Sequence, residues 1–491
     1  MTTTPSDRTP VGPAGSAERP STDRFPPDFR IAIDPSVQRV NSGKTLVGGS
    51  PLRLLRLTEA GARLVNSLRG GSPVPSDNPA HQLVRRLLSA GMVHPRPGPA
   101  AHAGRAVALV IPVRDRATEL EMTLDCLDSG EDVLVVDDGS HDASATYEIV
   151  HSRGAKLLRH KVTRGPAAAR NTGWRKASTD FVAFVDQDCQ PDPGWLDALL
   201  PHFNDPSVAA VAPRIRSRAS VASPAWLAKY EDARSPLDCG KREGPVRPRS
   251  WVPYVPTTAL VVRRVALEAV GGFDEALQVG EDVDLVWRLA AGGWTIRYEP
   301  TVAASHPTRD TFSGWLRQRF RYGTSAAPLA RRHGTAVAPL DISTSSAASW
   351  LLLAFGYGWA SVALTGLTTA LFIRRLVGLG YPWRYAFCLA GTGHLRAGLS
   401  VGTAVRRTWW PLGLALALVS RRSRLGILST VTFPLAGEWI SRAPGIDIGR
   451  WVALRLLDDL AYGTGVWMGC VSERSVAALK PVLSDGREHR S

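Results

Sequence analysis

Residues 181–188 read FVAFVDQD, an apolar run of five residues that ends in two carboxylates. Phe181 to Val185 has the length and the apolar character of a buried strand. Asp186 and Asp188 follow at its carboxyl end, within reach of one site. Binding sites in open α/β sheets gather at the carboxyl ends of the strands. This stretch therefore predicts a core strand that carries two carboxylates into a site.

The neighbouring segments show the same apolar pattern. AVALVIPV from Ala106, DVLVVDD from Asp132 and AKLL from Ala155 are apolar runs, and a helical stretch follows each of them. Alternation of strands and helices indicates a parallel sheet with crossover helices. We predict an α/β fold with a doubly wound sheet over residues 104–335.

Three polar clusters lie at predicted strand ends. The D-x-D pair can bind Mg²⁺ or Mn²⁺, which bridges the phosphates of a nucleotide sugar, although solvated turns often contain such a pair. Asp137 and Asp138 can accept hydrogen bonds from a uracil and a ribose, or can form a simple Asp-Gly turn. Residues 164–173, RGPAAARNTG, are small enough for close approach to a nucleotide, and Arg170 adds positive charge. The order and spacing of the three clusters favour nucleotide binding.

Together these clusters and Pro112-Val113-Arg114-Asp115 resemble glycosyltransferase family 2, of GT-A fold. The resemblance covers about Ala106 to Tyr322. It implies inverting transfer from an α-linked, usually UDP-activated sugar to an acceptor hydroxyl. One departure is Arg114, which stands where the family often has an aromatic residue and leaves the donor base less defined. The implied donor contacts are Pro112, Arg114, Asp115, Asp137, Asp138, Arg170 and Asp186, and the implied metal ligands are Asp186 and Asp188.

The second half of the expected site is GEDVDL, residues 280–285. In the resembled family an Asp of such a pair is the general base, which inversion requires because the attacking hydroxyl must lose its proton. We assign this role to Asp282, with Glu281 as its orienting neighbour. Asp284 is the alternative, on another face of the same predicted helix. The alternative to a catalytic role is that these carboxylates only stabilise the N-terminus of a helix through its dipole.

Two further elements follow. His306, after the strand-like TIRYEPTVAAS, is either a third metal ligand, a phosphate contact or a structural histidine. Gln318, Arg321 and Tyr322 resemble the Q-x-x-R-W element of processive members of the family, with Tyr in place of Trp. That resemblance implies that the aromatic residue supports the acceptor sugar and that the arginine faces the diphosphate. The alternative is a plain basic helix without such a role.

The N-terminal part begins with residues 1–27, a Pro- and Ser-rich tail that we expect to be disordered. Residues 28–97 predict a winged-helix-like domain: a hairpin around Asn41–Lys44, a helix capped by Thr58, and a second helix from Pro79 to Gly91. The whole chain, including LVGGSPLRLLRLTEAG at residues 46–61 and AGMVHP at 90–95, resembles the mycofactocin-system glycosyltransferases. The resemblance implies transfer of β-linked glucose units to a peptide-derived redox cofactor or its precursor. Peptide docking, a structural cap and nucleic-acid binding remain open for this domain, and we expect no nucleic-acid partner.

Residues 340–475 are hydrophobic and helical. Ile342 to Ile373 contains no charged residue and is long enough to cross a bilayer as one helix, while arginines interrupt Thr408 to Gly437. The alternative is a helical subdomain packed on the enzyme. The net charge of +15 suits anionic partners, and the five dispersed cysteines favour a reducing compartment. No secretory signal is evident at the N-terminus. We therefore predict location at the cytoplasmic face of the membrane.

Three rival functions remain open. A polysaccharide or lipid-linked sugar synthase would use the apolar C-terminal part to reach its acceptor. A catalytically inactive scaffold would bind a nucleotide sugar without releasing UDP. A nucleotidyltransferase on a related fold would release pyrophosphate instead.

Overall fold

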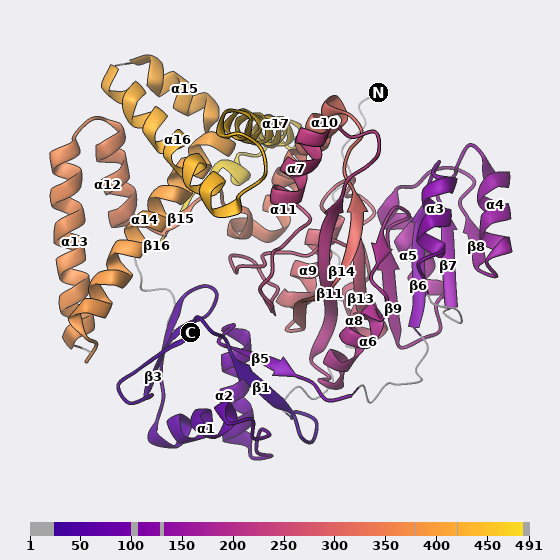
Figure 1. Ribbon diagram of the computed structural model, residues 1–491, viewed down its shortest axis with the longest axis horizontal. Coiled ribbons are helices and arrows are strands. Elements are labelled where there is room, and N and C mark those ends of the chain that lie inside the picture. Colours follow the sequence, from indigo (N-terminus) through magenta and orange to yellow (C-terminus); the bar gives the residue numbers. More distant parts are fainter. Residues whose placement is uncertain (1–23, 100–106, 128–131, 379, 420, 485–491) are drawn as a thin grey trace, which may run out of the picture.

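The computed structural model describes residues 24–99, 107–127, 132–378, 380–419 and 421–484. Figure 1 shows a small N-terminal domain, a central domain built on a large sheet, and a set of long helices along one side of it. Most of the predicted tail at 1–27 and much of the linker before residue 107 lie outside the described residues.

The N-terminal domain contains the two predicted helices but more strands than expected. Thr58 caps α1 (Glu59–Arg69), Asp77 caps α2 (Asn78–Ser89), and Gly91 follows α2 with a positive φ. The hairpin predicted around Asn41–Lys44 is present between residues 38–40 and 45–48, whereas residues 30–33 pair with residues 93–96. The strands are β1 (Arg30–Ile33), β2 (Gln38–Val40), β3 (Thr45–Gly48), β4 (Arg53–Arg56) and β5 (Val93–Arg96). β1 pairs with β5, while β2, β3 and β4 form a second sheet.

The central domain is a nine-stranded sheet in the order β10-β14-β11-β13-β9-β6-β7-β8, with β12 beside β14. Four strands are parallel neighbours, as predicted: β6 (Val107–Val113), β7 (Asp132–Asp137), β8 (Lys156–Arg159) and β9 (Phe181–Val185). The sheet as a whole is mixed, because β13 (Ala259–Arg263) runs antiparallel to both β9 and β11 (Val208–Arg218). The remaining strands are β10 (Gln190–Pro191), β12 (Gly244–Pro245) and β14 (Thr295–Pro307).

Helices cover both faces of the sheet, as Figure 1 shows. Residues of β9 alternate between the two apolar clusters, with Val182 and Phe184 in one and Phe181, Ala183 and Val185 in the other. A strand buried on both faces needs a continuous apolar run, which is the pattern at 181–185. The helices are α3 (Ala117–Leu124), α4 (Ala143–Ser152), α5 (Pro166–Lys176), α6 (Trp195–Leu199), α7 (Ala225–Arg234), α8 (Arg264–Val270), α9 (Glu281–Ala291), α10 (Phe312–Thr324) and α11 (Ala326–His333).

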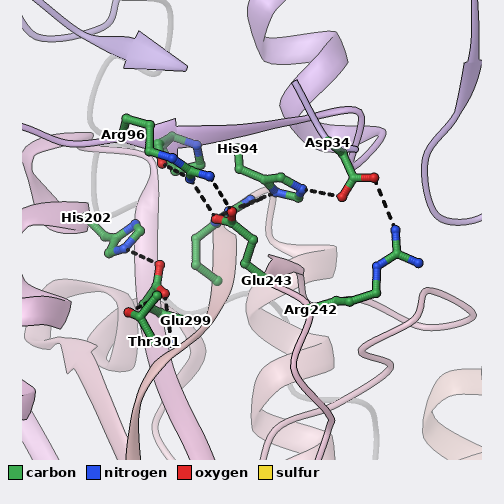
Figure 2. A network of polar contacts seen from close by, with 10 residues as sticks. Asp34, His94, Arg96, His202, Arg242, Glu243, Glu299 and Thr301 are labelled. Carbon is green, nitrogen blue, oxygen red and sulfur yellow. Dashed lines mark hydrogen bonds and ion pairs between the residues drawn. The ribbon is translucent and has the colours of Figure 1, made fainter. Parts of the chain in front are cut away.

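Polar contacts join the N-terminal and central domains (Figure 2). Arg96 contacts Glu243 through both terminal nitrogens, at 2.6 and 2.9 Å. Asp34 accepts from His94 Nε2 at 2.9 Å and from Arg242 at 3.1 Å. The Arg96–Glu243 and Asp34–Arg242 pairs fix the small domain against the segment that leads into β12.

The C-terminal part is helical, but its first predicted span is wrong as a single helix. Residues 342–373 divide at Phe355–Tyr357 into α12 and α13, which pack against each other. Within the described residues, one helix, α13, is long enough and apolar enough to cross a membrane. Thr408 to Gly437 is also divided, between α15 and α16. The elements are β15 (Asp341–Ser343), α12 (Thr344–Ala354), α13 (Gly358–Gly378), α14 (Trp383–Arg407), α15 (Trp410–Val419), α16 (Arg421–Arg442), α17 (Ile448–Ser472) and β16 (Val482–Ser484).

Glycines allow α17 to lie directly on α10 of the central domain. A Cβ atom added at Gly465 would stand 2.0 Å from the carbonyl oxygen of Phe320, and one at Gly323 would stand 2.0 Å from that of Tyr462. Backbone atoms cannot yield as a flexible side chain can. The helical part is therefore packed tightly on the central domain and is not a separate appendage.

Replacing Gly465 with Ala is expected to lower the free energy of unfolding by about 1–3 kcal/mol, because the new methyl group pushes α10 and α17 apart. Urea denaturation measures the loss. Gly437→Ala is the matched control, since no atom lies within 4 Å of the added Cβ, and it should leave stability unchanged or slightly raised. Equal stability of the two variants would contradict the tight contact.

Candidate active site

A cleft of about 750 Å³ lies between the sheet, the N-terminus of α9 and helices α10 and α17. Most residues of the D-x-D and E-D motifs reach it. The predicted residues along its walls are Arg170, Asp186, Glu281, Asp282, His306, Gln318, Arg321 and Tyr322. The structure therefore brings into one cleft residues that lie up to about 150 positions apart in the chain.

Arg170 of α5 connects the two acidic motifs. Its two terminal nitrogens donate to Asp186 at 2.7 Å and to Glu281 at 2.8 Å, and only 5% of the residue is exposed. Burial opposes the charge on Arg170, but the two carboxylates outweigh burial and raise its pKa. Burial likewise opposes ionisation of Asp186, and Arg170 overcomes it to lower the pKa of that carboxyl. Arg170, which was predicted to face the nucleotide, thus also holds the D-x-D and E-D motifs together.

Asp188 lies at the edge of the cleft, behind two of its wall residues. Its carboxylate accepts from Arg116 at 2.9 Å, and His306 Nε2 lies 3.4 Å from its other oxygen. His306 belongs to β14 itself, not to the segment after it. Among the described residues no group of three or more His, Cys, Asp or Glu side chains is arranged to hold a metal. The predicted set of Asp186, Asp188 and His306 is therefore not assembled as three ligands, because Asp186 turns toward Arg170.

Asp282 is the carboxyl of the cleft whose pKa is raised. It is the second residue of α9, after Gly280, whose φ of 85° lies in the left-handed region. Burial, and then the neighbouring Glu281 carboxylate, raise the pKa of Asp282 to about 7. A carboxyl with such a pKa can accept a proton near neutral pH.

The alternative base, Asp284, faces away from the cleft. It is 1% exposed and contacts Arg288 at 2.7 Å and His333 at 2.8 Å. The contact with His333 joins α9 to α11, whereas Arg288 belongs to α9 itself. The geometry thus favours Asp282 over Asp284.

The predicted donor residues at the carboxyl ends of β6 and β7 form a neighbouring cluster outside the cleft walls. Asp138 accepts four hydrogen bonds, from His160, Thr163 and the backbone nitrogens of Arg164 and Gly165. Asp138 therefore shapes the loop that leads into α5.

The other members of this cluster are also held by protein contacts. Asp137 is buried against Arg159 at 3.0 Å and against the backbone nitrogen of Ser140 at 2.8 Å. Asp115 accepts from His141, and the backbone nitrogen of Arg114 donates to the Gln187 side chain at 2.8 Å. Pro112 precedes them on β6. Because Gln187 lies between Asp186 and Asp188, this last bond links the cluster to the D-x-D motif.

Gln318 and Tyr322 lie on one face of α10 and bond to each other at 2.9 Å. Arg321 lines the cleft beside them. Buried Arg319, next to Gln318 in the chain, contacts Asp458 of α17 at 3.1 Å and also Glu231. The buried ion pairs fix the orientation of the cleft-lining face.

Sequence reasoning missed Arg116 and two residues of the helical part, Arg407 and Tyr462, which also line the cleft. The Arg407 guanidinium lies 3.5 Å from the centre of the Tyr462 ring. A usable signal was the presence of Arg406-Arg407 and Asp458-Asp459 inside apolar helices, where ionisable residues need partners. Asp459 indeed contacts Arg406 and Arg407.

The chain is similar to known glycosyltransferases. The family model "Glycosyl transferase family 2" matches residues 108–271. A pre-mycofactocin glycosyltransferase of Mycobacterium tuberculosis (strain ATCC 25618 / H37Rv) is 42% identical over 471 residues, covering 94% of this chain and 99% of that protein. A poly-beta-1,6-N-acetyl-D-glucosamine synthase of Staphylococcus aureus (strain COL) is 27% identical over 39% of this chain and 46% of that protein. Among solved structures, a mannosyltransferase from Pyrobaculum calidifontis aligns over 61% of this chain and 87% of that chain, with 20% identity and a TM-score of 0.37.

Proposed function

Because the chain belongs to the pre-mycofactocin glycosyltransferases of family 2, with their GT-A fold, we propose that it moves hexose units from a UDP-sugar to a peptide-derived redox cofactor or its precursor. The sugar in this proposal is glucose, added with inversion in β-linkage, as one unit or several. One observation carries the proposal: Arg170 joins Asp186 to Glu281, beside Asp282, in a single cleft.

In the proposed reaction Asp282 accepts the proton of the acceptor hydroxyl. The hydroxyl oxygen forms a bond to the anomeric carbon from the face opposite UDP. The bond from that carbon to the phosphate oxygen breaks, and UDP leaves with the electron pair. Arg321 offsets part of the charge on the departing diphosphate. Gln318 and Tyr322 support the acceptor sugar. Glu281 and Arg170 orient Asp282 relative to the donor side.

The donor side fits a divalent ion, Mg²⁺ or Mn²⁺, by its chemistry. Such an ion commonly takes one or two carboxylates from the protein and completes its shell with phosphate oxygens and water. Asp188 and neighbouring His306 offer oxygen and nitrogen donors, and Asp186 lies two residues away on the same strand end. When bound, the ion would supply positive charge to the diphosphate.

The direct test is incubation of the purified protein with UDP-glucose, Mn²⁺ and candidate acceptors, followed by mass spectrometry. The proposal predicts products heavier by whole hexose units and one UDP released per unit. Activity that requires added membrane lipid and extends a glycan would instead identify a polysaccharide or lipid-linked sugar synthase. UDP-sugar binding without UDP release with any acceptor would identify an inactive scaffold.

The acidity of Asp282 predicts the pH dependence. Since its pKa is raised to about 7, lowering the pH through that value protonates the base. We expect kcat/KM to fall about tenfold per pH unit below it. Glu281→Gln removes the second cause of the raised pKa, so the acidic limb should move to lower pH. A rate that stays flat between about pH 8 and 5 would exclude Asp282 as the base.

We also propose that helices α12–α16 attach the enzyme to the cytoplasmic face of the membrane. Large apolar side chains are widely exposed on these helices, among them Trp359 at 90% and Val419 at 76%. Extended apolar surface of this kind is a signature of contact with lipid or protein. Interspersed arginines suit anionic lipid headgroups.

Flotation with phosphatidylglycerol-containing vesicles tests the membrane proposal. The wild-type protein is expected to float, and the double variant Trp359→Asp and Val362→Asp on α13 to lose at least about tenfold in vesicle affinity. Val221→Asp is the control, because Val221 is fully exposed but lies far from these helices in the chain. Unchanged flotation of the α13 variant would rule out this surface.

A further inference from the structure

A second cavity, of about 1000 Å³, lies between the N-terminal and central domains. Phe29, Arg85 and Ser89 contribute from the small domain, and Trp287 and Trp294 from the central domain. Trp287 also lines the active-site cleft, so the two spaces lie on either side of that residue. Neither the donor nor the proposed proton transfer uses this cavity.

The charges around the cavity are unequal. Five arginines line it, Arg85, Arg86, Arg247, Arg297 and Arg332, but only one acidic residue, Asp205. Asp205 is already neutralised, because Arg85 contacts both of its oxygens. Asp274, outside the cavity, pairs with Arg332 at 2.7 Å. Arg247 and Arg297 carry the charge that remains poorly balanced.

Three of these arginines hold donors that the protein leaves unused. The Nε atoms of Arg85, Arg247 and Arg297 are buried and have no hydrogen-bond partner among the described residues. Burying a donor without an acceptor costs free energy, so such groups are usually paired. His202 Nδ1, also on the cavity wall, is unpartnered in the same way, while its Nε2 lies 3.2 Å from Glu299 (Figure 2).

The pKa values of two of these arginines also indicate charges that lack a partner. Burial lowers the pKa of Arg297 to about 10, although Glu243 and Glu299 act to raise it. The nearest oxygen of Glu243 is 3.7 Å away, too far for a good hydrogen bond. Burial also lowers the pKa of Arg247 to about 10, and Arg53 adds to the effect. An anion in the cavity would compensate both guanidinium groups.

We propose that this interdomain cavity binds an organic carboxylate, whose charge the arginines neutralise and whose apolar body packs against Trp287 and Trp294. The apolar walls, which include Phe29, Val246 and Ile296, favour an apolar body over a hydrated inorganic ion. The unused donors are single Nε atoms on separate arginines, an arrangement that suits an anion with one negative charge. Because both domains line the cavity, an occupant bridges them and stabilises their association.

Calorimetric titration without any nucleotide sugar tests this proposal apart from the proposed reaction. The probes are 4-phenylbutyrate and its amide, 4-phenylbutanamide, which share one apolar body and differ in charge. The wild-type protein is expected to bind the acid at least about tenfold more tightly than the amide, as a charge-assisted hydrogen bond predicts. Inorganic phosphate is the third probe and should bind more weakly than the acid.

Two variants and a control locate the binding. Arg247→Gln should remove the preference for the acid, and Ser89→Trp, at an exposed position on the cavity wall, should abolish binding by filling the space. Arg63→Gln removes an exposed arginine of the same domain outside the cavity and should change nothing. Equal affinity for acid and amide, binding of phosphate as tight as that of the acid, or unchanged binding in Ser89→Trp would overturn the proposal.

Discussion

Replacing Asp282 with Asn is expected to reduce hexose transfer by about 10²–10⁴-fold, because the amide cannot accept the proton of the attacking hydroxyl. The substitution keeps the size of the side chain and removes only its basicity. Steady-state UDP release with saturating acceptor measures the loss. UDP affinity should stay close to that of the wild type, since the donor side is built from other residues.

Asp284→Asn is the matched control for Asp282. It changes a carboxylate two residues further along α9 that contacts Arg288 and His333 instead of the cleft. We expect a lower Tm, because a buried ion pair loses its partner, and a rate per folded molecule within a few-fold of the wild type. The opposite pattern, with Asp284→Asn inactive and Asp282→Asn active, would transfer the role of base to Asp284.

Replacing Asp188 with Asn is expected to lower the rate by about 10²–10³-fold, since charge stabilisation by a metal contributes several kcal/mol to the barrier. The wild-type protein should lose a similar factor in EDTA and regain it with Mn²⁺. Added Mn²⁺ should restore little activity to Asp188→Asn.

Asp192→Asn serves as the control for Asp188. Asp192 is a half-exposed carboxylate near the same sheet edge, but it contacts Arg216 at 2.9 Å instead of His306. We expect its metal dependence to match that of the wild type. Full activity of the wild-type protein in EDTA would show that the D-x-D motif serves no metal.

Local patterns in the sequence predicted local structure well. The apolar run before Asp186 is β9, the cap at Thr58 begins α1, Pro79 lies in the first turn of α2, and Glu281 begins α9. Each depends on neighbouring residues alone, through strand burial, side-chain capping or helix start. Of the two acidic motifs, Asp186, Glu281 and Asp282 line one cleft, and their roles in the reaction stay predictions.

Local patterns could not predict the contacts between distant segments. Arg170 was predicted to face the nucleotide, yet its partners Asp186 and Glu281 lie 16 and 111 residues further along the chain. The antiparallel β13 has the same apolar pattern that a buried parallel strand would have. Arg407 and Tyr462 reach the cleft only because α14 and α17 return to the central domain, and no local signal fixes that return.

UDP binding to the Asp282→Asn protein, measured by calorimetry first with Mn²⁺ and then with EDTA, tests most directly whether the carboxylates of this cleft divide into a donor side and a proton acceptor. We predict affinity near that of the wild type with Mn²⁺, and at least about tenfold weaker binding in EDTA, in a protein whose hexose transfer is about 10²–10⁴-fold slower. Loss of UDP binding in this variant, or binding that ignores the metal, would contradict the division.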